Sequence, residues 1–546
     1  MKTVYILIFI IFSAIAFNAC EKFLDAEPIT TQTDINYYSN PKDAAVALVG
    51  CYDALQLIWS DDIAMPLASD VMSDLCFGGT GATDVDNYAM IDEYDENKAP
   101  GLQNMFEKNW QFYYKGINRC NVLINRMNNI EWGNNVNVKK SITGEVHFLR
   151  AFFYFDLVRM FERVPLLKEP ISTVVGQSEP DDTYTLITED LLVAIDNCSD
   201  IPYTSMDLTE FGHATKWAAE ALMARVYLYY TGYYGKNDLV GLVTQANALS
   251  YVEDVIENSE HALVDSFPDL WPAAATYTAA KSGKPIIDNT YAGEVNKEVV
   301  FSIKYTYTSD YNGNTDGNHW MAMNGLRKQY YPKYGYGYGW GCCTVLPDVY
   351  KTWPAGDKRR DASIMAIAEE RIAYTQINDM KEYTGYFTKK YTPTCDKDGL
   401  SIAEETYGGV DFMVGQFQDY FCIRYADVLL MAAELGSTNA LQYVNDVHTR
   451  AGLDPLTEVN KDIIFEERRL EFAFEGLRFW DLLRYDNTLA YAADKVAFDG
   501  KVLNGGVEED KVIDGANLLL TRGLFQIPNN EITLSNGVLK QNPGWD

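Results

Sequence analysis

Basic residues are scarce in this chain. Its 546 residues include 45 lysines and arginines against 77 aspartates and glutamates, so the formal net charge is −32 with histidine neutral. Binding to nucleic acid depends on a basic face that displaces counterions from phosphates. An acidic surface keeps a protein in solution and is repelled by anionic partners. The composition therefore excludes a nucleic acid as a partner.

The motifs of common enzyme classes are missing as well. The chain contains no H-E-x-x-H, G-x-S-x-G or Walker sequence, no C-x-x-C pair, and no Cys/His cluster with zinc-ligand spacing. The glycine-aromatic run at 335–341 lacks the Lys-Ser/Thr of a phosphate-binding loop. These absences disfavour the enzyme classes that such motifs mark, and we predict no cofactor and no metal site, although Asp- and Asn-rich loops leave a structural Ca²⁺ open. A glycoside hydrolase remains an alternative, because 77 acidic residues supply carboxylate pairs by chance.

Cysteine is too sparse for a disulfide scaffold. Nine cysteines occur in the whole chain, and eight remain once Cys20 is set aside. We expect most of the eight to be buried as small apolar residues. Cysteines adjacent in sequence rarely bond to each other, which argues against a bridge within the 342–343 pair. The eight are Cys51, Cys76, Cys120, Cys198, Cys342, Cys343, Cys395 and Cys422.

Long apolar runs are confined to the start of the chain. Residues 4–17 are apolar except for Ser13, and Lys2 precedes them. This is about the length of a signal-peptide core, roughly 7–15 residues, and it is too short to span a bilayer. We predict that a signal peptide of residues 1–19 is removed between Ala19 and Cys20. No later run reaches the ~18 apolar residues of a membrane-spanning helix.

Cys20 becomes the first residue of the mature chain under this prediction. Residues 17–20 resemble the lipobox of bacterial lipoproteins, with Phe17 where leucine is usual. Two or three acyl chains on one cysteine anchor a protein stably, since each buried methylene contributes about 0.8 kcal/mol. We predict lipidation at Cys20 and a body tethered to a membrane. Plain secretion is the alternative.

Two parts of the chain have helical periodicity. Asn40 and Pro41 form a strong helix start, and apolar residues recur at helical spacing downstream. Paired lengths and alanine-rich faces favour about four helical hairpins, stacked like tetratricopeptide repeats, at about residues 40–260 and 423–485. The expected helices are 41–57, 105–127, 141–161, 184–195, 215–230, 246–256, 423–434, 439–449 and 461–484, the last with a corner at Gly476.

The amino-acid composition changes between these two helical parts. Residues 265–418 are rich in Gly, Pro, Tyr, Asn and Thr, and β-like runs such as 298–303 stand between polar loops. A segment of this length carries function or packs by itself. The sequence thus predicts a mainly α-helical protein in which residues 20–546 form a single domain, with helix pairs as the scaffold and a loop-rich insertion carrying short strands.

Several segments together resemble the SusD/RagB family. The most specific are EVHFLRAFFYFDLVRMFERVP at 145–165 and ERRLEFAFEGLRFWDLLR at 467–484. Each is short, but the matches are spread over nearly the whole chain. The others lie at 21–25, 423–434, 524–532 and 541–545.

The resemblance implies a lipoprotein of the outer membrane that faces the outside of a glycan-foraging Gram-negative cell. Members of the family bind oligosaccharides, deliver them to a partner SusC-like TonB-dependent transporter, and are not enzymes. Some members bind peptides instead, and a peptide-binding uptake lipoprotein is therefore the alternative within the family. A third hypothesis is an interaction protein whose aromatic residues contact only the transporter.

A saccharide site needs flat rings and paired hydrogen-bonding groups. Tyr or Trp covers the apolar face of a sugar, and Asp, Asn and Arg bind its hydroxyls. Two loop stretches, 59–94 and 305–340, combine these residue types, and the resemblance implies a ligand face there. A packing role is the alternative for Trp320, and a plain loop residue for His319. The candidates are Asp84, Asn87, Tyr88, Tyr311, Asn314, Asp316, Trp320, Arg327 and Tyr334, with His319 beside them.

Overall fold

The structure of the protein is a computed structural model, and it describes residues 38–60, 65–84, 87–171, 173–306, 317–402 and 416–545. The predicted signal peptide of residues 1–19 and the predicted lipidation residue Cys20 lie outside the described residues. Three candidate ligand residues, Tyr311, Asn314 and Asp316, also lie outside them. In the described ranges, no helix is both long enough and apolar enough to cross a membrane.

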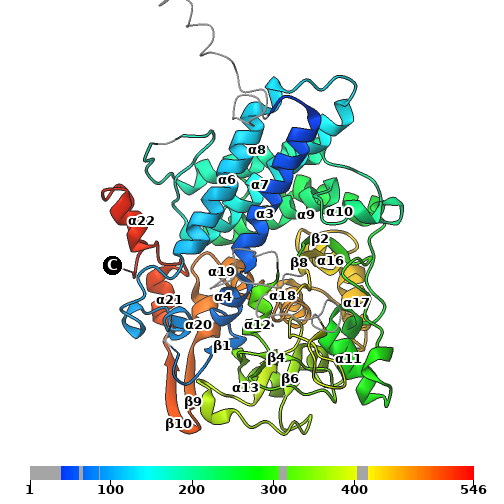
Figure 1. Ribbon diagram of the computed structural model, residues 1–546, viewed down its shortest axis with the longest axis vertical. Helices are drawn as coiled ribbons and strands as arrows, with labels where there is room; N and C mark the ends of the chain where they lie inside the picture. The colour runs from blue at the N-terminus through cyan, green and yellow to red at the C-terminus, as the bar shows by residue number, and fades with distance from the viewer. Residues whose placement is uncertain are drawn as a thin grey trace, which may run out of the picture.

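Helix pairs form the scaffold, and the described part of the chain contains four of them. The second helix of each pair contacts the first helix of the next, and α3, α6, α7 and α8 stand side by side in the upper part of Figure 1. This confirms the predicted stack of about four helical hairpins. The pairs are α3 (Pro41–Ser60) with α6 (Glu107–Arg126), α7 (Val136–Phe161) with α8 (Pro180–Asn197), α9 (Lys216–Tyr234) with α10 (Gln245–Asn258), and α16 (Tyr425–Glu434) with α17 (Ala440–Arg450).

Local sequence signals set the ends of these helices. The side chain of Thr215 accepts a hydrogen bond from the Ala218 backbone N–H and so caps the start of α9. Gly235 follows the helix with a φ of 64°, the left-handed conformation that glycine adopts without a steric cost. Ala218 and Ala221 are fully buried, so their small side chains let the neighbouring helices approach closely.

One predicted helix begins later than expected. The helix predicted at 423–434 starts at Tyr425, because Ile423 and Arg424 belong to strand β8 (Tyr420–Arg424). This strand pairs antiparallel with β2 (Val299–Ile303), which lies in the β-like run predicted at 298–303. A fully buried strand and a buried helix carry the same run of apolar residues, so periodicity alone does not separate them.

The corner predicted at Gly476 is confirmed. The chain turns there between α18 (Lys461–Glu471) and α19 (Arg478–Tyr485), and Gly476 has a φ of 68°. Only a residue without a Cβ adopts this conformation readily.

The insertion is more regular than its composition predicted. It contributes three strands of a four-stranded antiparallel sheet in the order β1-β5-β7-β6, and β1 comes from earlier in the chain. It also contains short helices, some begun by a proline in the first turn. The strands are β1 (Cys76–Gly79), β5 (Cys342–Val345), β6 (Ile364–Ala366) and β7 (Tyr386–Thr388), and the helices are α11 (Pro272–Lys281), α12 (His319–Met323), α13 (Pro347–Lys351) and α14 (Lys358–Ser363).

A C-terminal hairpin was not predicted. Strands β9 (Phe498–Asn504) and β10 (Val507–Ile513) pair over their whole length and project at the lower left of Figure 1. Gly505 and Gly506 make the turn, and both have a positive φ. A Gly-Gly pair between two strand-like segments is a sequence signal for a hairpin, and it could have predicted this one. The remaining helices are α4 (Met65–Val71), α5 (Asn87–Asp92), α20 (Ala490–Val496), α21 (Gly515–Thr521) and α22 (Asn529–Leu534).

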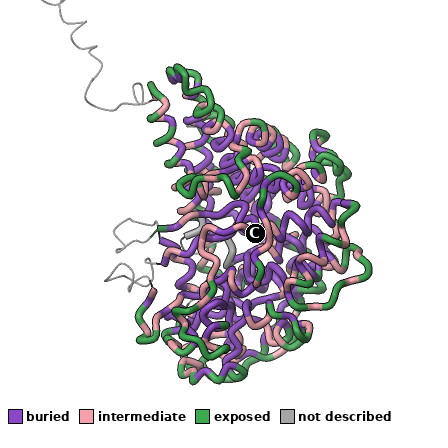
Figure 2. The backbone as a smooth tube through the Cα atoms, turned by 90° about the vertical axis from the view of Figure 1, so that its right-hand side faces the viewer, coloured by how far each residue is buried: buried purple, intermediate pink, exposed green. Residues whose placement is uncertain are grey.

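The interior is continuous from the helix pairs into the insertion, as the buried segments in Figure 2 show. All eight cysteines after Cys20 lie within the described residues and are buried, as expected for small apolar side chains.

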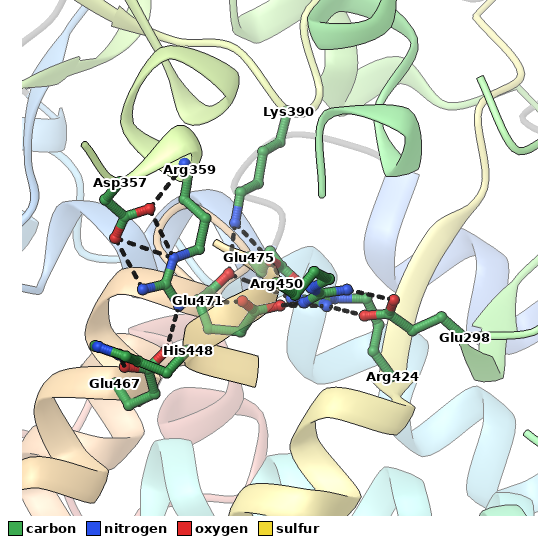
Figure 3. A network of polar contacts seen from close by, with 10 residues as sticks. All are labelled: Glu298, Asp357, Arg359, Lys390, Arg424, His448, Arg450, Glu467, Glu471 and Glu475. Atoms are coloured by element: carbon green, nitrogen blue, oxygen red, sulfur yellow. Dashed lines mark hydrogen bonds and ion pairs between the residues drawn. The ribbon is translucent and has the colours of Figure 1, made fainter. Parts of the chain in front are cut away.

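A buried network of ions joins the insertion to the scaffold (Figure 3). The Arg424 guanidinium binds Glu298 at 2.5 Å and both Glu471 and Glu475 at 2.8 Å. From the insertion, Lys390 binds Glu475 at 2.6 Å, and Arg359 binds Asp357 at 2.8 Å and Glu467 at 2.5 Å. Burial pushes the pKa of Glu471 upward, but Arg450, Arg424 and Arg359 outweigh burial and hold that pKa below its usual range.

Candidate ligand-binding site

Three loops meet on one side of the insertion, and we call their surface the loop face. They are residues 80–84, 326–340 and 376–382. Backbone bonds join them: Thr80 N–H donates to Gly341 O at 3.3 Å, Lys381 N–H donates to Thr80 O at 3.1 Å, and Ala82 N–H donates to Asp379 O at 3.3 Å. Short parallel strands β3 (Leu326–Arg327) and β4 (Tyr338–Gly339) stiffen the middle loop.

Arg327 lies at the centre of the loop face. Its side chain is only 7% exposed, and its guanidinium contacts Asp379 at 3.0 Å, Asp84 at 3.8 Å and the Trp340 carbonyl at 3.1 Å. The structure thus brings together two candidates, Asp84 and Arg327, that are far apart in sequence. A Cβ on Gly81 would lie 2.0 Å from the Arg327 guanidinium, so a larger residue at position 81 would displace this guanidinium.

The carboxylates around Arg327 remain partly open. The side chain of Asp84 is 48% exposed and that of Asp379 is 32% exposed. The hydrogen bond from Lys328, at 2.8 Å, and the nearby Arg327 lower the pKa of Asp379. Asp379 is therefore ionised near neutral pH and keeps lone pairs on its exposed side that can accept hydrogen bonds.

Partly exposed aromatic rings lie on the same 326–340 loop as Arg327. Tyr330 is 37% exposed and packs against Tyr338 with ring centroids 5.4 Å apart. Trp340 is half-buried and meets His319 edge to face at 6.0 Å. Tyr330, Tyr338 and Trp340 lie in the predicted 305–340 stretch but were not singled out. Alternation with glycine did not distinguish them, because Tyr336 stands between two glycines of the same run and is fully buried.

Three other candidates lie in the interior. Tyr88, Trp320 and Tyr334 are 4%, 3% and 7% exposed. The Trp320 ring packs against Tyr391 at 4.8 Å and Tyr420 at 5.7 Å. This burial favours the packing role that was the alternative for Trp320. Asn87 is the first residue of α5, and its side chain is not among those described.

The described residues contain no group of three or more His, Cys, Asp or Glu side chains arranged to hold a metal ion. Where carboxylates converge beside the loop face, a lysine ammonium lies among them. The chemistry of the loop face is therefore that of rings, carboxylates and a guanidinium.

Two family models match the chain. The one described as the SusD family matches residues 348–545, and the one described as starch-binding associating with outer membrane matches residues 69–228. SusD-like protein P2 of Formosa agariphila is 23% identical over 555 residues, which cover 96% of this chain and 96% of the relative.

Solved structures share the whole architecture. A laminarin binding SusD-like protein is 25% identical, with a TM-score of 0.72 over 93% of this chain and 100% of that one. Surface glycan-binding protein A from Bacteroides thetaiotaomicron, solved in complex with laminarihexaose, is 23% identical, with a TM-score of 0.72 over 92% of this chain and 100% of that one. At 23% identity, the similarity to surface glycan-binding protein A shows a shared fold and nothing about the ligand. Stacked helix pairs with a loop-rich insertion are thus the architecture of SusD-like proteins. The chain belongs to the SusD/RagB family.

Proposed function

We propose that the protein binds an oligosaccharide at the loop face, without catalysing a reaction, and delivers it to a SusC-like TonB-dependent transporter in the outer membrane. The observation that carries the proposal is that one loop, 326–340, bears both the partly exposed rings of Tyr330, Tyr338 and Trp340 and the arginine, Arg327, that contacts the open carboxylates of Asp84 and Asp379. Rings cover the apolar face of a sugar, and carboxylates accept hydrogen bonds from its hydroxyls.

Family membership and the name of one relative support this choice of ligand. One matching family model is described as starch-binding, and a structural neighbour at 25% identity is named for laminarin binding. Laminarihexaose is therefore the first probe, followed by starch-derived oligosaccharides.

Calorimetric titration of the purified mature chain tests the proposal. We expect saturable heat with at least one oligosaccharide and no release of reducing sugar during the titration. Trp340→Ala should weaken binding about tenfold, which corresponds to about 1.4 kcal/mol, because a stacking surface is lost. Trp340→Phe keeps a ring and serves as the matched control. Binding of peptides but of no saccharide would replace the ligand class, and release of reducing sugar would favour the hydrolase.

The predicted anchor places this function at the cell surface. Under the proposal, residues 1–19 are removed, Cys20 carries acyl chains in the outer membrane, and the rest of the chain faces outward. Cys20→Ala should move the protein from the membrane fraction to the medium or periplasm. Mass spectrometry of the mature N-terminus checks the same point, and a mature chain without acyl groups on Cys20 would contradict it.

The transporter is proposed as the partner on family grounds. The net charge of −32 favours a partner with a basic rim. Co-purification with the transporter should therefore weaken as ionic strength rises from 0.05 to about 0.5 M, since salt screens exposed charges. Binding that is insensitive to salt would argue for an apolar interface instead.

A further inference from the structure

The C-terminal hairpin reaches the loop face through one buried lysine. Lys511 lies on β10 and is 5% exposed. Its ammonium contacts three carboxylates, those of Asp92 at 2.9 Å, Glu93 at 2.9 Å and Glu382 at 2.7 Å. One cation therefore holds three acidic side chains in a place that water does not reach freely.

One of the three carboxylates belongs to the loop face, and the other two lie at the end of the helix that follows one of its loops. Asp92 and Glu93 stand at the end of α5, which follows the 80–84 loop in sequence. Glu382 is the last residue of the 376–382 loop, and its second carboxylate oxygen accepts the Gly79 backbone N–H at 3.1 Å, directly before the 80–84 loop. Lys511 thus holds the carboxylate through which the 376–382 loop contacts Gly79, and it ties this carboxylate to the acids at the end of α5.

Backbone bonds from the hairpin act on the same loop. Gly505 N–H donates to Met380 O at 2.7 Å, and Tyr383 N–H donates to Leu503 O at 2.9 Å. The side chain of Asn504 accepts the Glu382 backbone N–H at 2.8 Å. The hairpin therefore extends the hydrogen bonding of the 376–382 loop and presents Lys511 to it.

Electrostatics make this lysine hard to replace. Burial, and then the negative charge of Glu382, raise the pKa of Asp92, whereas Lys511 lowers it. A second cation, Lys98, reaches only Glu93, at 2.6 Å, and its side chain is 46% exposed. Without the Lys511 ammonium the three carboxylates would repel one another, and the contact between Glu382 and Gly79 would be strained.

We propose that Lys511 is a positioning residue for the glycan site: it sets the relative placement of the 80–84 and 376–382 loops from a hairpin that lies outside the loop face. The inference rests on the proposed function for its ligand, but the placement of the loops is testable without a ligand. Anchoring of the hairpin alone, with no effect on the loops, is the competing explanation.

Lys511→Met is the decisive variant, because methionine keeps the apolar stem and removes the charge. Lys501→Met is the matched control, since Lys501 lies on the same hairpin with a 56% exposed side chain and pairs only with exposed acids, Glu508 and Asp510. Glu382→Gln is the second variant, for use if Lys511→Met does not fold; it keeps an acceptor for Gly79 and removes one of the three charges. Lys511→Arg tests rescue by a retained charge.

The measurements are hydrogen exchange of peptides covering 76–84 and 376–384, and titration with the saccharide that the unmodified protein binds. Lys511→Met should speed exchange in both peptides and weaken binding about tenfold, as loop displacements of this kind do. Lys511→Arg should restore most of the slow exchange and most of the affinity. Lys501→Met should change neither the exchange of the two peptides nor the affinity. Glu382→Gln should act in the same direction as Lys511→Met and less strongly.

Unchanged exchange in both loop peptides, or faster exchange confined to the hairpin with unchanged affinity, would overturn the inference. If the unmodified protein binds no saccharide, the proposed function fails instead. The exchange data alone then decide whether Lys511 places the loops.

Discussion

Arginine and carboxylate meet in two regions of this protein under opposite conditions. Where the scaffold meets the insertion, Arg424 and its partners Glu298, Glu471 and Glu475 are at most 2% exposed. At the loop face, Arg327 is also buried, at 7% exposed, but the carboxylates of Asp84 and Asp379 are 48% and 32% exposed. The buried carboxylates bind protein donors, whereas those of the loop face keep lone pairs for a ligand. Exposure of the acceptor, rather than the kind of ion pair, separates a structural role from a binding role.

The largest effect is expected from the buried network. Arg424→Met removes the cation that Glu298, Glu471 and Glu475 share and leaves the buried network with an excess of negative charge, which should lower the free energy of unfolding by about 3–5 kcal/mol. Urea denaturation measures this. Arg163→Met is the matched control, because Arg163 and its partner Glu179 have side chains 52% and 62% exposed, and such pairs contribute little. Equal losses in the two variants would abolish the distinction between the regions.

A pair of neighbouring aspartates sharpens the comparison within the interior. Burial raises the pKa of Asp70 to about 8, and its bond from the Gly476 N–H only partly offsets this. The folded protein therefore holds a proton that the unfolded chain releases above about pH 4, so this residue lowers stability as pH rises from about 4 to 8. Asp70→Asn should flatten the stability curve in this window and gain at least about 1 kcal/mol at pH 8.

Asp74 is the matched control, because its pKa shifts in the opposite direction from that of Asp70. Burial pushes its pKa upward, but the Arg478 guanidinium, at 2.7 Å, outweighs burial and the pKa lies below its usual value. Its contribution is present above about pH 4 and is lost as pH falls further. Asp74→Asn should therefore destabilise the protein by about 2 kcal/mol at pH 7, and the loss should shrink in acid. Thermal melts from pH 3 to 8 compare the two variants, and curves of the same sign would contradict the assignment.

The smallest effect on folding is expected at the loop face. Asp84→Ala should change the free energy of unfolding by less than about 0.5 kcal/mol, because the side chain is half exposed, yet it should weaken saccharide binding by about 1 kcal/mol. Asp84→Asn keeps an acceptor for Gly81 N–H and should bind nearly as well. A stability loss as large as that of Arg424→Met would show that the loop face is structural.

Helical periodicity and capping residues were sufficient to predict the helix pairs, because both signals depend only on residues close together in sequence. The alanines of α9 and the corner at Gly476 stand in the sequence where the structure uses them. Composition indicated a loop-rich insertion with short strands, but it indicated neither the helices of the insertion nor the β1-β5-β7-β6 sheet, since short strands from distant segments pair only in the folded chain. The β9–β10 hairpin was not predicted either.

The candidate site was likewise predicted only in part from the sequence. A mixture of Asp, Arg and aromatic residues at 305–340 indicated the region, and the contact between the candidates Asp84 and Arg327 emerged only from the structure. Which rings reach the surface was not visible, because Trp320 and Trp340 have the same chemistry and differ only in what packs on them.

Sequence by itself determined the helical scaffold, the family and the residue types available for a ligand, because helix formation and composition depend on near neighbours along the chain. Only the tertiary structure decided which carboxylates remain open, which rings are covered, and that Lys511 of a C-terminal strand meets acids from α5 and from the 376–382 loop. Burial and pairing are properties of contacts between distant segments, and no local pattern encodes them.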